Sequence, residues 1–221
     1  MPETDTVCID FIELPEQRAS SSCYIPPVID GRPVTMLGNG SPCLSADAGG
    51  YVYFPDSITE VGDYAFLNCG KLEGFSYYTD ECCLKKIGQQ AFYGTVFQEK
   101  SKSTGGSISF GTLLYRCFAD AEQYEVFSGC TVIAADAFAH NGSVREIILP
   151  DSLTEIGDGA FYDCGALQTI VIPDSVTKLG TGAFVDCKSL ESVTLGSGLT
   201  ETGSDLFVGC DALKNVPAAK P

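Results

Sequence analysis

The chain repeats one pattern of apolar and polar positions, most clearly between residues 144 and 210. Its copies are LPDSLTEIGDGAFYDC (149–164), IPDSVTKLGTGAFVDC (172–187) and LGSGLTETGSDLFVGC (195–210). Phe161, Phe184 and Phe207 occupy the same place in these copies, at intervals of 23 residues. A fixed period of this size is typical of a solenoid, in which each repeat buries its apolar face only by stacking on its neighbours.

Within one repeat, the pattern predicts two extended segments joined by turns. In residues 167–172 (LQTIVI), the first, fourth and sixth positions are apolar and recur in other copies, which predicts a short strand. The PDS tripeptide that follows ends this strand, because proline removes a ladder donor and aspartate closes a turn. Val176 and Leu179 are predicted to point inward from a second extended segment. Ala183 and Phe184 then fill the core from a helical or 3₁₀ turn on the opposite edge.

A small residue stands between the second extended segment and the Ala-Phe pair in each copy. It is Gly180 in one copy, and glycine stands there in four others, at positions 62, 88, 157 and 203. Glycine permits a tight bend, but Ala134 occupies the same place in another copy. Small size, rather than a positive φ, is therefore the predicted requirement.

The repeat can be traced upstream through two irregular regions. In the first coil, Pro42 stands where the phenylalanine is expected, and a later coil contains a polar insertion, Glu99–Ser107, followed by a strand-like segment, Ile108–Cys117. The expected organisation is an N-terminal cap or arm at 1–23, a single solenoid domain at 24–217 that is irregular at 24–50 and 93–123, and a tail at 218–221.

The eleven cysteines include no C-x-x-C pair, which argues against a zinc site and a thioredoxin-like redox pair. Four of them follow the repeat phenylalanine by three residues and should form one buried column: Cys69, Cys164, Cys187 and Cys210. Side chains on adjacent parallel strands lie ~4.8 Å apart, beyond the ~3.8 Å typical of disulfide Cβ atoms, so free thiols are predicted in this column. Asn141 and Thr95 occupy the same place in other copies, which predicts a small group that bonds to the backbone of a turn. Pairing among the other seven cysteines stays open.

Composition narrows the class of protein further. The 221 residues include 44% hydrophobic residues, enough for a sizeable core, and carry a formal charge of −16. Nucleic-acid binding is disfavoured because phosphate contacts need clustered Lys and Arg, and anionic membranes are disfavoured for the same reason. No apolar run approaches the ~20 residues of a transmembrane helix, and residues 1–20 lack the features of a signal peptide.

The consensus I-x-[IL]-P-x-S-[VL]-T-x-[IL]-G-x-x-A-F-x-x-C resembles the leucine-rich repeats of the BspA-like type, closely at 51–92 and 124–216 and more loosely at 24–50 and 93–123. The resemblance implies a leucine-rich-repeat solenoid of the β-rich α/β class, a curved right-handed stack of about eight coils. Its parallel sheet would line the concave face, with short strands and 3₁₀ turns elsewhere. The resemblance also implies adhesion or host-protein binding at the cell surface or in secreted form, in host-associated bacteria. It brings no catalytic residue, cofactor or metal ligand with it.

Residues between the inward-pointing strand positions form the predicted concave face, and most of them are polar or small. Ile148 and Val171 stand side by side and predict a modest apolar patch, which is how a recognition site is often built. The alternative, that these are ordinary solvent-exposed strand positions, stays open. The acidic members favour a basic protein or a cationic ligand. The candidate binding residues are Glu73, Glu122, Glu125, Arg145, Ile148, Gln168, Thr169, Val171, Glu191 and Thr194.

No constellation of residues predicts catalysis. His140 is the only histidine and follows Phe138 on an outer turn, whereas a Cys-His nucleophile would need a low-pKa thiolate beside it in a cleft. Two functions remain: a non-enzymatic module that recognises a protein or glycan ligand, or a structural, self-assembling segment of a larger protein. The first predicts a monomer, and the second predicts end-to-end oligomers through the coil near 206–216.

Overall fold

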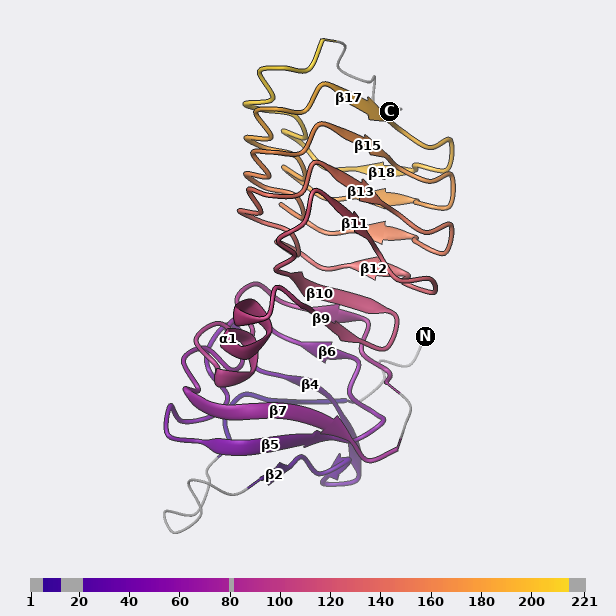
Figure 1. Cartoon of the computed structure of the whole chain (residues 1–221). Coiled ribbons are helices and arrows are strands. Elements are labelled where there is room, and N and C mark those ends of the chain that lie inside the picture. The colour runs from indigo at the N-terminus through magenta and orange to yellow at the C-terminus, as the bar shows by residue number, and fades with distance from the viewer. Residues whose placement is uncertain (1–5, 13–21, 80–81, 215–221) are drawn as a thin grey trace. The chain divides into compact units, whose positions relative to one another are not determined.

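The computed structural model describes residues 6–12, 22–79 and 82–214, and it forms two compact units, Met1–Ser103 and Thr104–Pro221. Each unit is a stack of coils with short, mostly parallel strands (Figure 1), and the chain makes about eight coils in all. The predicted solenoid of stacked repeats is therefore confirmed. The prediction of a single domain over 24–217 stays a prediction.

The N-terminal unit contains two sheets. In the first, three strands run parallel to β4 in the order β1-β4-β6-β8, and β3 pairs antiparallel with β4. The strands of this sheet are β1 (Val7–Ile9), β3 (Val28–Ile29), β4 (Arg32–Leu37), β6 (Glu60–Val61) and β8 (Lys86–Ile87). The second sheet is parallel and contains β2 (Cys23–Tyr24), β5 (Gly49–Phe54) and β7 (Lys71–Tyr77). The unit also contains the helix α1 (Val96–Ser103), which begins ahead of the predicted polar insertion.

The C-terminal unit repeats one coil regularly. One of its sheets, the β11–β17 sheet, joins residues 23 apart in sequence, as the pairs Ile147 with Ile170 and Ile170 with Val193 show. Its strands are β11 (Gln123–Glu125), β13 (Glu146–Ile148), β15 (Thr169–Val171) and β17 (Ser192–Thr194). The other sheet contains β9 (Ser107–Phe110), β10 (Leu113–Cys117), β12 (Val132–Ile133), β14 (Glu155–Ile156), β16 (Lys178–Leu179) and β18 (Glu201–Thr202).

The segment predicted as one strand over Ile108–Cys117 is instead an antiparallel hairpin of β9 and β10. Gly111 lies at the bend between the two strands with φ of 56°, a conformation that glycine adopts without steric cost. The apolar run did not reveal the turn because both strands carry apolar residues on either side of it. Only β10 continues the stack, through its parallel pairing with β12.

The repeat phenylalanines stack at the centre of the C-terminal unit. Phe138, Phe161 and Phe184 are fully buried, with ring centroids 5.2 and 5.1 Å apart, and Phe207 extends the stack at 5.5 Å. Each phenylalanine lies in a hydrogen-bonded turn that ends three residues later, as Cys164 N donates to Phe161 O over 3.2 Å. This third position, which is cysteine at 69, 164, 187 and 210, is called the ladder position below. The predicted core role of the Ala-Phe pair is confirmed, and rings stacked in this way stabilise each other beyond the burial of their area.

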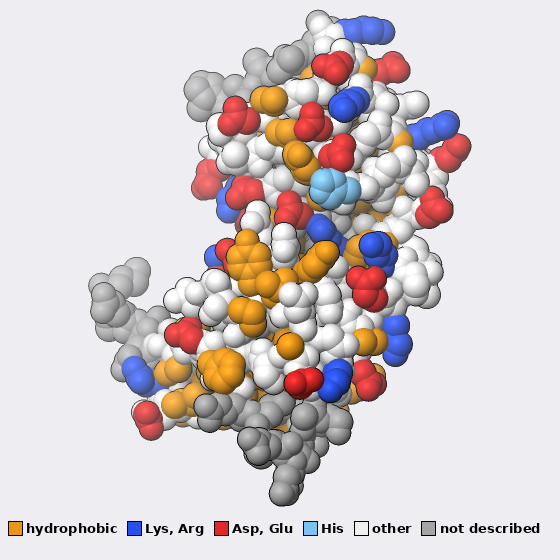
Figure 2. Space-filling view, turned by 90° about the vertical axis from the view of Figure 1, so that its left-hand side faces the viewer, with side chains coloured by type: hydrophobic (Ala, Val, Ile, Leu, Met, Phe, Trp, Pro, Cys, Tyr) orange, Lys and Arg blue, Asp and Glu red, His pale blue; other side chains and the backbone are white. Residues whose placement is uncertain are grey.

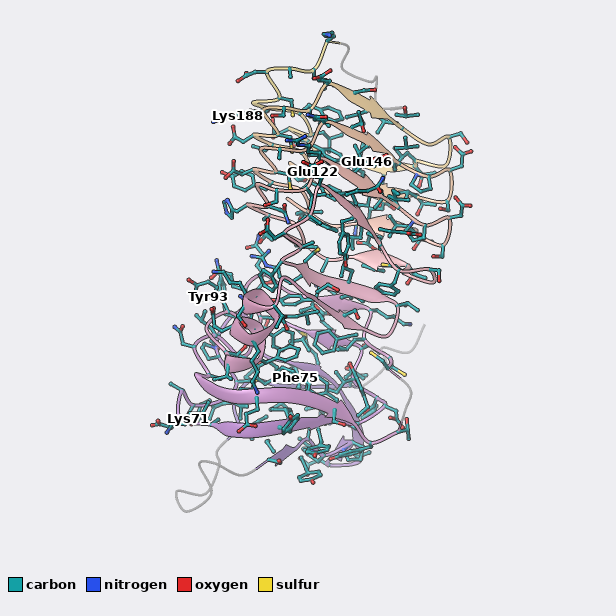
Figure 3. The ribbon with its side chains drawn as sticks, viewed as in Figure 1. Lys71, Phe75, Tyr93, Glu122, Glu146 and Lys188 are labelled. Atoms are coloured by element: carbon teal, nitrogen blue, oxygen red, sulfur yellow. The ribbon has the colours of Figure 1, made fainter. Side chains whose placement is uncertain are left out.

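Two coils use cysteine in place of the repeat phenylalanine. The amide of Phe138 donates to Ala160 O in the next coil, and the amides of Cys43 and Cys117 donate in the same way to Ala65 O and Ala137 O. Cys43 therefore occupies the phenylalanine position that the sequence assigned to Pro42. In the N-terminal unit, Phe75 on β7 packs against the repeat phenylalanines (Figure 3), with its ring 5.1 Å from Phe66 and 4.5 Å from Phe92.

The small residue of each repeat lies directly against the backbone of the preceding coil. A methyl group at Gly180 would lie 2.4 Å from Asp158 N, and one at Gly203 would lie 2.2 Å from Thr181 N. Neither glycine has a positive φ, so the prediction that small size is required is confirmed. The left-handed residue comes two positions later, and it is Tyr64, Gln90, Asp136 or Asp205 in copies that lack glycine there.

Candidate recognition surface

The outward side of the β11–β17 sheet carries the exposed residues of the regular repeats. Ile147 and Ile170 point into the core, and their successors Ile148 and Val171 point outward with 40% and 61% of their surface exposed. The alternation follows from the pleat, because successive side chains of a strand face opposite sides. The register places Ile148 and Val171 on neighbouring strands at matching positions, which makes them one apolar patch.

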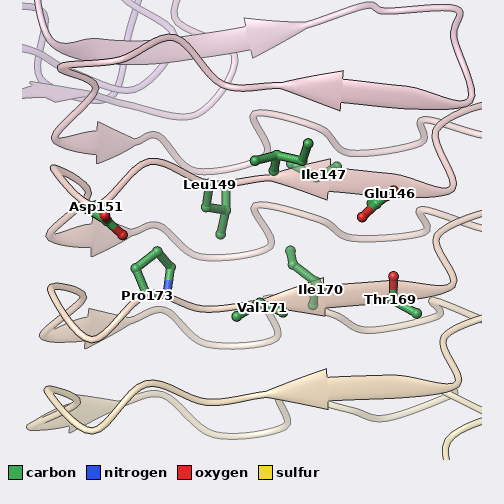
Figure 4. A pocket seen from close by; sticks show the side chains of 9 residues that line it. Glu146, Ile147, Leu149, Asp151, Thr169, Ile170, Val171 and Pro173 are labelled. Atoms are coloured by element: carbon green, nitrogen blue, oxygen red, sulfur yellow. The ribbon is translucent and has the colours of Figure 1, made fainter.

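A groove of about 260 Å³ runs along β13 and β15 beside this patch (Figure 4). Glu146 and Thr169 lie at one end of the groove, where the strands begin. Asp151 and Pro173 lie at the other end, in the turns that follow the strands. The patch therefore has polar groups at both ends, which could orient a ligand held by apolar contact.

Two cross-strand pairs hold part of the charge on this sheet. Gln123 Nε2 donates to Glu146 Oε2 over 2.7 Å, and Arg145 lies 3.5 Å from Glu122. Figure 3 labels Glu122 and Glu146, which come from neighbouring coils. Exposed pairs of this kind contribute little to stability, so their main effect is to set the pattern of charge that a ligand meets. From residue 122 to residue 194, the exposed strand positions include four glutamates and one arginine, which leaves the surface acidic.

The structure places nine of the ten candidate binding residues on this one sheet or immediately before its strands, and all nine are exposed. Backbone bonds from Arg145 N to Glu122 O and from Gln168 N to Arg145 O place three of them in one column. Glu73 is also exposed, but it lies on β7 in the N-terminal unit and belongs to a different sheet. Asn215, which follows the exposed strand residue Ser192 by one repeat of 23 residues, lies outside the described residues.

Two groove residues that lie beyond the strands are not among the binding residues predicted from the sequence. Asp151 and Pro173 belong to the recurring P-D-S turns that were interpreted as strand-ending signals. They reach the groove because those turns stack with the same spacing as the strands. Their fixed offset from the exposed apolar position was the available signal.

The ladder cysteines bond to the backbone of the neighbouring coil. The thiols of Cys164, Cys187 and Cys210 donate to Phe138 O, Phe161 O and Phe184 O over 3.2, 3.1 and 3.0 Å. Cys69 makes a longer bond of 3.8 Å to Leu44 O. All eleven cysteines fall within the described residues and are free thiols in this structure.

Asn141 and Thr95, which share the ladder position, also bond to backbone atoms. Asn141 Nδ2 donates to Ala119 O over 2.9 Å, and Thr95 Oγ1 donates to Phe92 O over 2.8 Å. The prediction of a small group that bonds to a turn's backbone is therefore met by three residue types. The shared requirement is a donor that reaches a buried carbonyl.

His140 lies on the turns that follow the repeat phenylalanines. Its Nδ1 is 2.9 Å from Asp163 Oδ2, and its ring meets that of Tyr162 edge-on at 5.3 Å. Figure 2 shows this side of the molecule, where acidic side chains are scattered around the histidine. His140 has φ of 63°, and the same place is Asp163 or Asp186 in the next coils, so a turn position that tolerates a left-handed residue accounts for it.

Neither a metal site nor a membrane-spanning helix is found in the described parts of the chain. Within residues 6–12, 22–79 and 82–214, no three His, Cys, Asp or Glu side chains are grouped so that they could hold a metal ion. The helix found there is too short and too polar to cross a bilayer.

These features define a solenoid of the leucine-rich-repeat type: 23-residue coils with parallel strands, a column of stacked aromatic rings in the core, and a small residue in each coil packed against the backbone of the preceding one. The family model for the BspA type leucine rich repeat region matches residues 48–119 and 108–220, with six copies. The chain belongs to this family. Its members are in general non-enzymatic repeat scaffolds, and such repeats generally mediate protein interactions.

Several solved bacterial structures are similar to the chain. A leucine rich repeat protein from T. pallidum is 27% identical, with a TM-score of 0.43 over 97% of this chain and 86% of that one. A leucine-rich repeat protein from Eubacterium ventriosum is 18% identical (TM-score 0.48; 87% and 64% covered), and the pneumococcal vaccine antigen PcpA is 16% identical (TM-score 0.43; 93% and 80% covered). No curated protein matches the chain.

Proposed function

We propose that this chain is a non-enzymatic recognition module that binds a protein through the outward side of its β11–β17 sheet. The observation that carries this proposal is the pair of exposed apolar side chains, Ile148 and Val171, beside a groove that ends in polar groups. A buried apolar centre with a polar rim is the usual composition of a protein interface.

The charge of the sheet indicates which charge the surface of the partner carries. Glu122, Glu125, Glu146 and Glu191 lie on the β11–β17 sheet or immediately before its strands, and Arg145 is the one base among the exposed positions of this sheet from 122 to 194. A partner with Lys or Arg around an apolar contact would be attracted by this surface and would lose affinity as salt is added. The partner is therefore expected to present a basic rim around an apolar anchor.

The proposed location is the cell surface or the extracellular space, with adhesion to a host protein as the role. Membership in the BspA-type family supports this location, since such proteins are often surface proteins. The eleven free thiols are compatible with an oxidising extracellular environment, because most of them are buried and few are accessible to an oxidant.

The test is binding of the purified chain to a panel of extracellular-matrix proteins, in parallel with a double variant, Ile148→Lys and Val171→Lys. Both side chains are exposed, so the double variant should fold normally. Val208→Lys is the matched control, because Val208 is 56% exposed in the same unit but lies outside the sheet. Thermal unfolding of all three proteins checks that the fold is kept.

Binding that the double variant loses and the Val208→Lys variant keeps would support recognition on this sheet. Charge reversal at Glu122 and Glu191 should weaken the same binding, whereas reversal at Glu73, on the other unit, should leave it unchanged. Absence of binding at micromolar concentration, together with end-to-end oligomers in light scattering, would overturn the proposal in favour of a structural, self-assembling segment.

A further inference from the structure

A second surface gathers tyrosine side chains on the outward side of the β2–β5–β7 sheet in the N-terminal unit. Tyr24 and Tyr53 are register partners on β2 and β5, and their rings stack with centroids 4.4 Å apart and planes 6° apart. Tyr78, just after β7, adds a third ring 6.4 Å from that of Tyr24. We call this surface the tyrosine platform, and its residues are Tyr24, Tyr51, Tyr53, Ser76 and Tyr78.

Tyr51 lies flat against the sheet because its neighbour has no side chain. The register pairs Tyr51 with Gly74, and a methyl group at Gly74 would lie 2.8, 3.2 and 3.6 Å from Cε1, Cδ1 and Cζ of the Tyr51 ring. Gly74 does not have a positive φ, so its backbone does not require glycine. Its effect is to let the ring rest on the strand with the other side toward solvent, and Tyr51 keeps 42% of its surface exposed.

The platform is held in place before any ligand arrives. The Tyr78 hydroxyl donates to Ile25 O over 2.6 Å, which ties the turn after β7 to the strand end at β2. The stacked Tyr24 and Tyr53 rings restrict each other's rotation. Because tyrosine has few rotatable bonds and these rings are already oriented, binding would cost little conformational entropy.

The exposed rings of the platform lie together rather than singly, and a cluster of exposed aromatic side chains is typical of a binding site. Tyr24 is 63% exposed and Tyr78 is 43% exposed, although both rings could lower their free energy by being covered. None of the five platform residues carries a charge at neutral pH, in a chain whose formal charge is −16. An acidic ligand would be repelled by the chain as a whole, and the five platform residues offer a basic ligand no carboxylate, although Glu73 is exposed beside Gly74 on β7.

We propose that the tyrosine platform binds a neutral oligosaccharide. The face of an aromatic ring is negative, and the C–H bonds on the flat side of a pyranose ring are weakly positive, so the two surfaces attract as well as exclude water. The tyrosine and Ser76 hydroxyls at the edges of the platform can both donate and accept hydrogen bonds to sugar hydroxyls. The platform and the proposed protein-binding sheet share no residues and belong to different units, so this proposal does not depend on the proposed function.

The experiment is a titration of the purified chain with cellohexaose, a neutral β-linked glucose oligomer, by calorimetry and by tyrosine fluorescence. The chain contains no tryptophan, so the fluorescence reports on tyrosine directly. Tyr51→Ala and Tyr24→Ala should each raise Kd at least about tenfold, because each removes one stacking face. Tyr51→Phe keeps the ring and should stay within a few fold of the parent.

Two further variants separate ring position from ring loss. Gly74→Ala should weaken binding as Tyr51→Ala does, because the added methyl group displaces the Tyr51 ring without removing it. Tyr93→Ala is the matched control, since Tyr93 is 51% exposed but lies outside the platform, and it should bind as the parent does. If Tyr51→Ala fails to fold, Gly74→Ala and Tyr24→Ala decide the question.

Three results would overturn the proposal. One is the absence of saturable binding to cellohexaose, mannohexaose and xylohexaose at millimolar concentration. Another is saturable binding that Tyr51→Ala, Tyr24→Ala and Gly74→Ala leave unchanged. The third is tighter binding of decaproline or of the acidic hexagalacturonate than of any neutral oligosaccharide, which would assign the platform to a peptide or an anionic ligand.

Discussion

The Cys187 thiol donates a hydrogen bond to the carbonyl oxygen of Phe161, 3.1 Å away in the preceding coil. Both residues are fully buried, so no water can replace the bond. The ladder position therefore selects a small side chain with a donor, which explains why asparagine and threonine also occur there.

Replacing this thiol tests the role of the ladder. Cys187→Ala should lower the free energy of unfolding by about 1 kcal/mol, because the buried Phe161 carbonyl keeps its bond from Cys164 N but loses the one from the thiol. Cys187→Ser keeps a donor and should lose less. Urea unfolding followed by circular dichroism gives both values, and an alanine variant as stable as the serine variant would contradict the assigned hydrogen bond.

The buried thiols also predict loss of stability at high pH. Burial raises the pKa of Cys69 to about 11, and hydrogen bonding with Cys164, with burial, raises that of Cys187 to about 12, from an ordinary value of 9.0. Below pH 9, these thiols are neutral in both folded and unfolded chains. Above pH 9, the unfolded chain loses their protons first, so stability should fall as pH rises toward 11.

The measurement is the urea midpoint between pH 7 and pH 10.5. Tyrosine and lysine titrate in the same range, so the Cys187→Ala variant is the control. Its midpoint should fall less steeply above pH 9 than that of the parent. Equal slopes in the two proteins would show that Cys187 contributes nothing to the pH dependence.

Gly180→Ala tests the close approach of adjacent coils. The new methyl group would lie 2.4 Å from backbone atoms of Gly157 and Asp158, so the coils must separate, and we expect a loss of about 1–3 kcal/mol or more. Gly165→Ala is the matched control, because no atom lies within 4 Å of its added methyl group. Its effect should stay within about 0.5 kcal/mol. Similar thermal midpoints for the two variants would contradict the prediction.

A pair of neighbouring glutamines tests the left-handed turn position. Gln90 has φ of 50° and Gln89 does not have a positive φ, while both are exposed. Gln90→Gly should raise stability by up to about 1 kcal/mol, because glycine adopts this conformation without strain. Gln89→Gly should lower stability slightly through backbone entropy. A Gln90→Gly variant that is less stable than the Gln89→Gly variant would reverse this assignment.

Much of the fold and part of the candidate site could be predicted from the sequence. The inward positions of Leu167, Ile170 and Ile172, all buried, follow from an alternation that each repeat contains in full. The neighbouring exposed positions Ile148 and Val171 follow from the same alternation and the repeat period. The sequence does not distinguish a protein ligand from a glycan ligand, because the identity of exposed strand residues does not by itself specify what binds to them.

The irregular coils could not be predicted in detail because their residues do not follow the 23-residue period. Tyr24, Tyr51 and Tyr53 lie in the irregular coil or at the start of the first regular one, and the register shifts between Gly50 and Tyr51. The alternation predicts that Gly74 and Ser76 face outward as exposed positions, but Gly74 is buried beneath the ring of Tyr51, and the sequence does not reveal that contact. The hairpin of β9 and β10 was missed for a related reason, since its turn depends on Gly111 alone.

The sequence by itself determined the repeat, its period, the residues that face the core and the column of ladder cysteines, because these depend on local alternation repeated at fixed intervals. Only the tertiary structure decided which groups meet across coils: the thiol of Cys187 with Phe161 O, Asp158 against Gly180, and the ring of Tyr51 over Gly74. The physical reason is that hydrogen bonds and close contacts form or fail with changes of a few tenths of an ångström in the distance between neighbouring backbones. Those distances are set only when the coils stack.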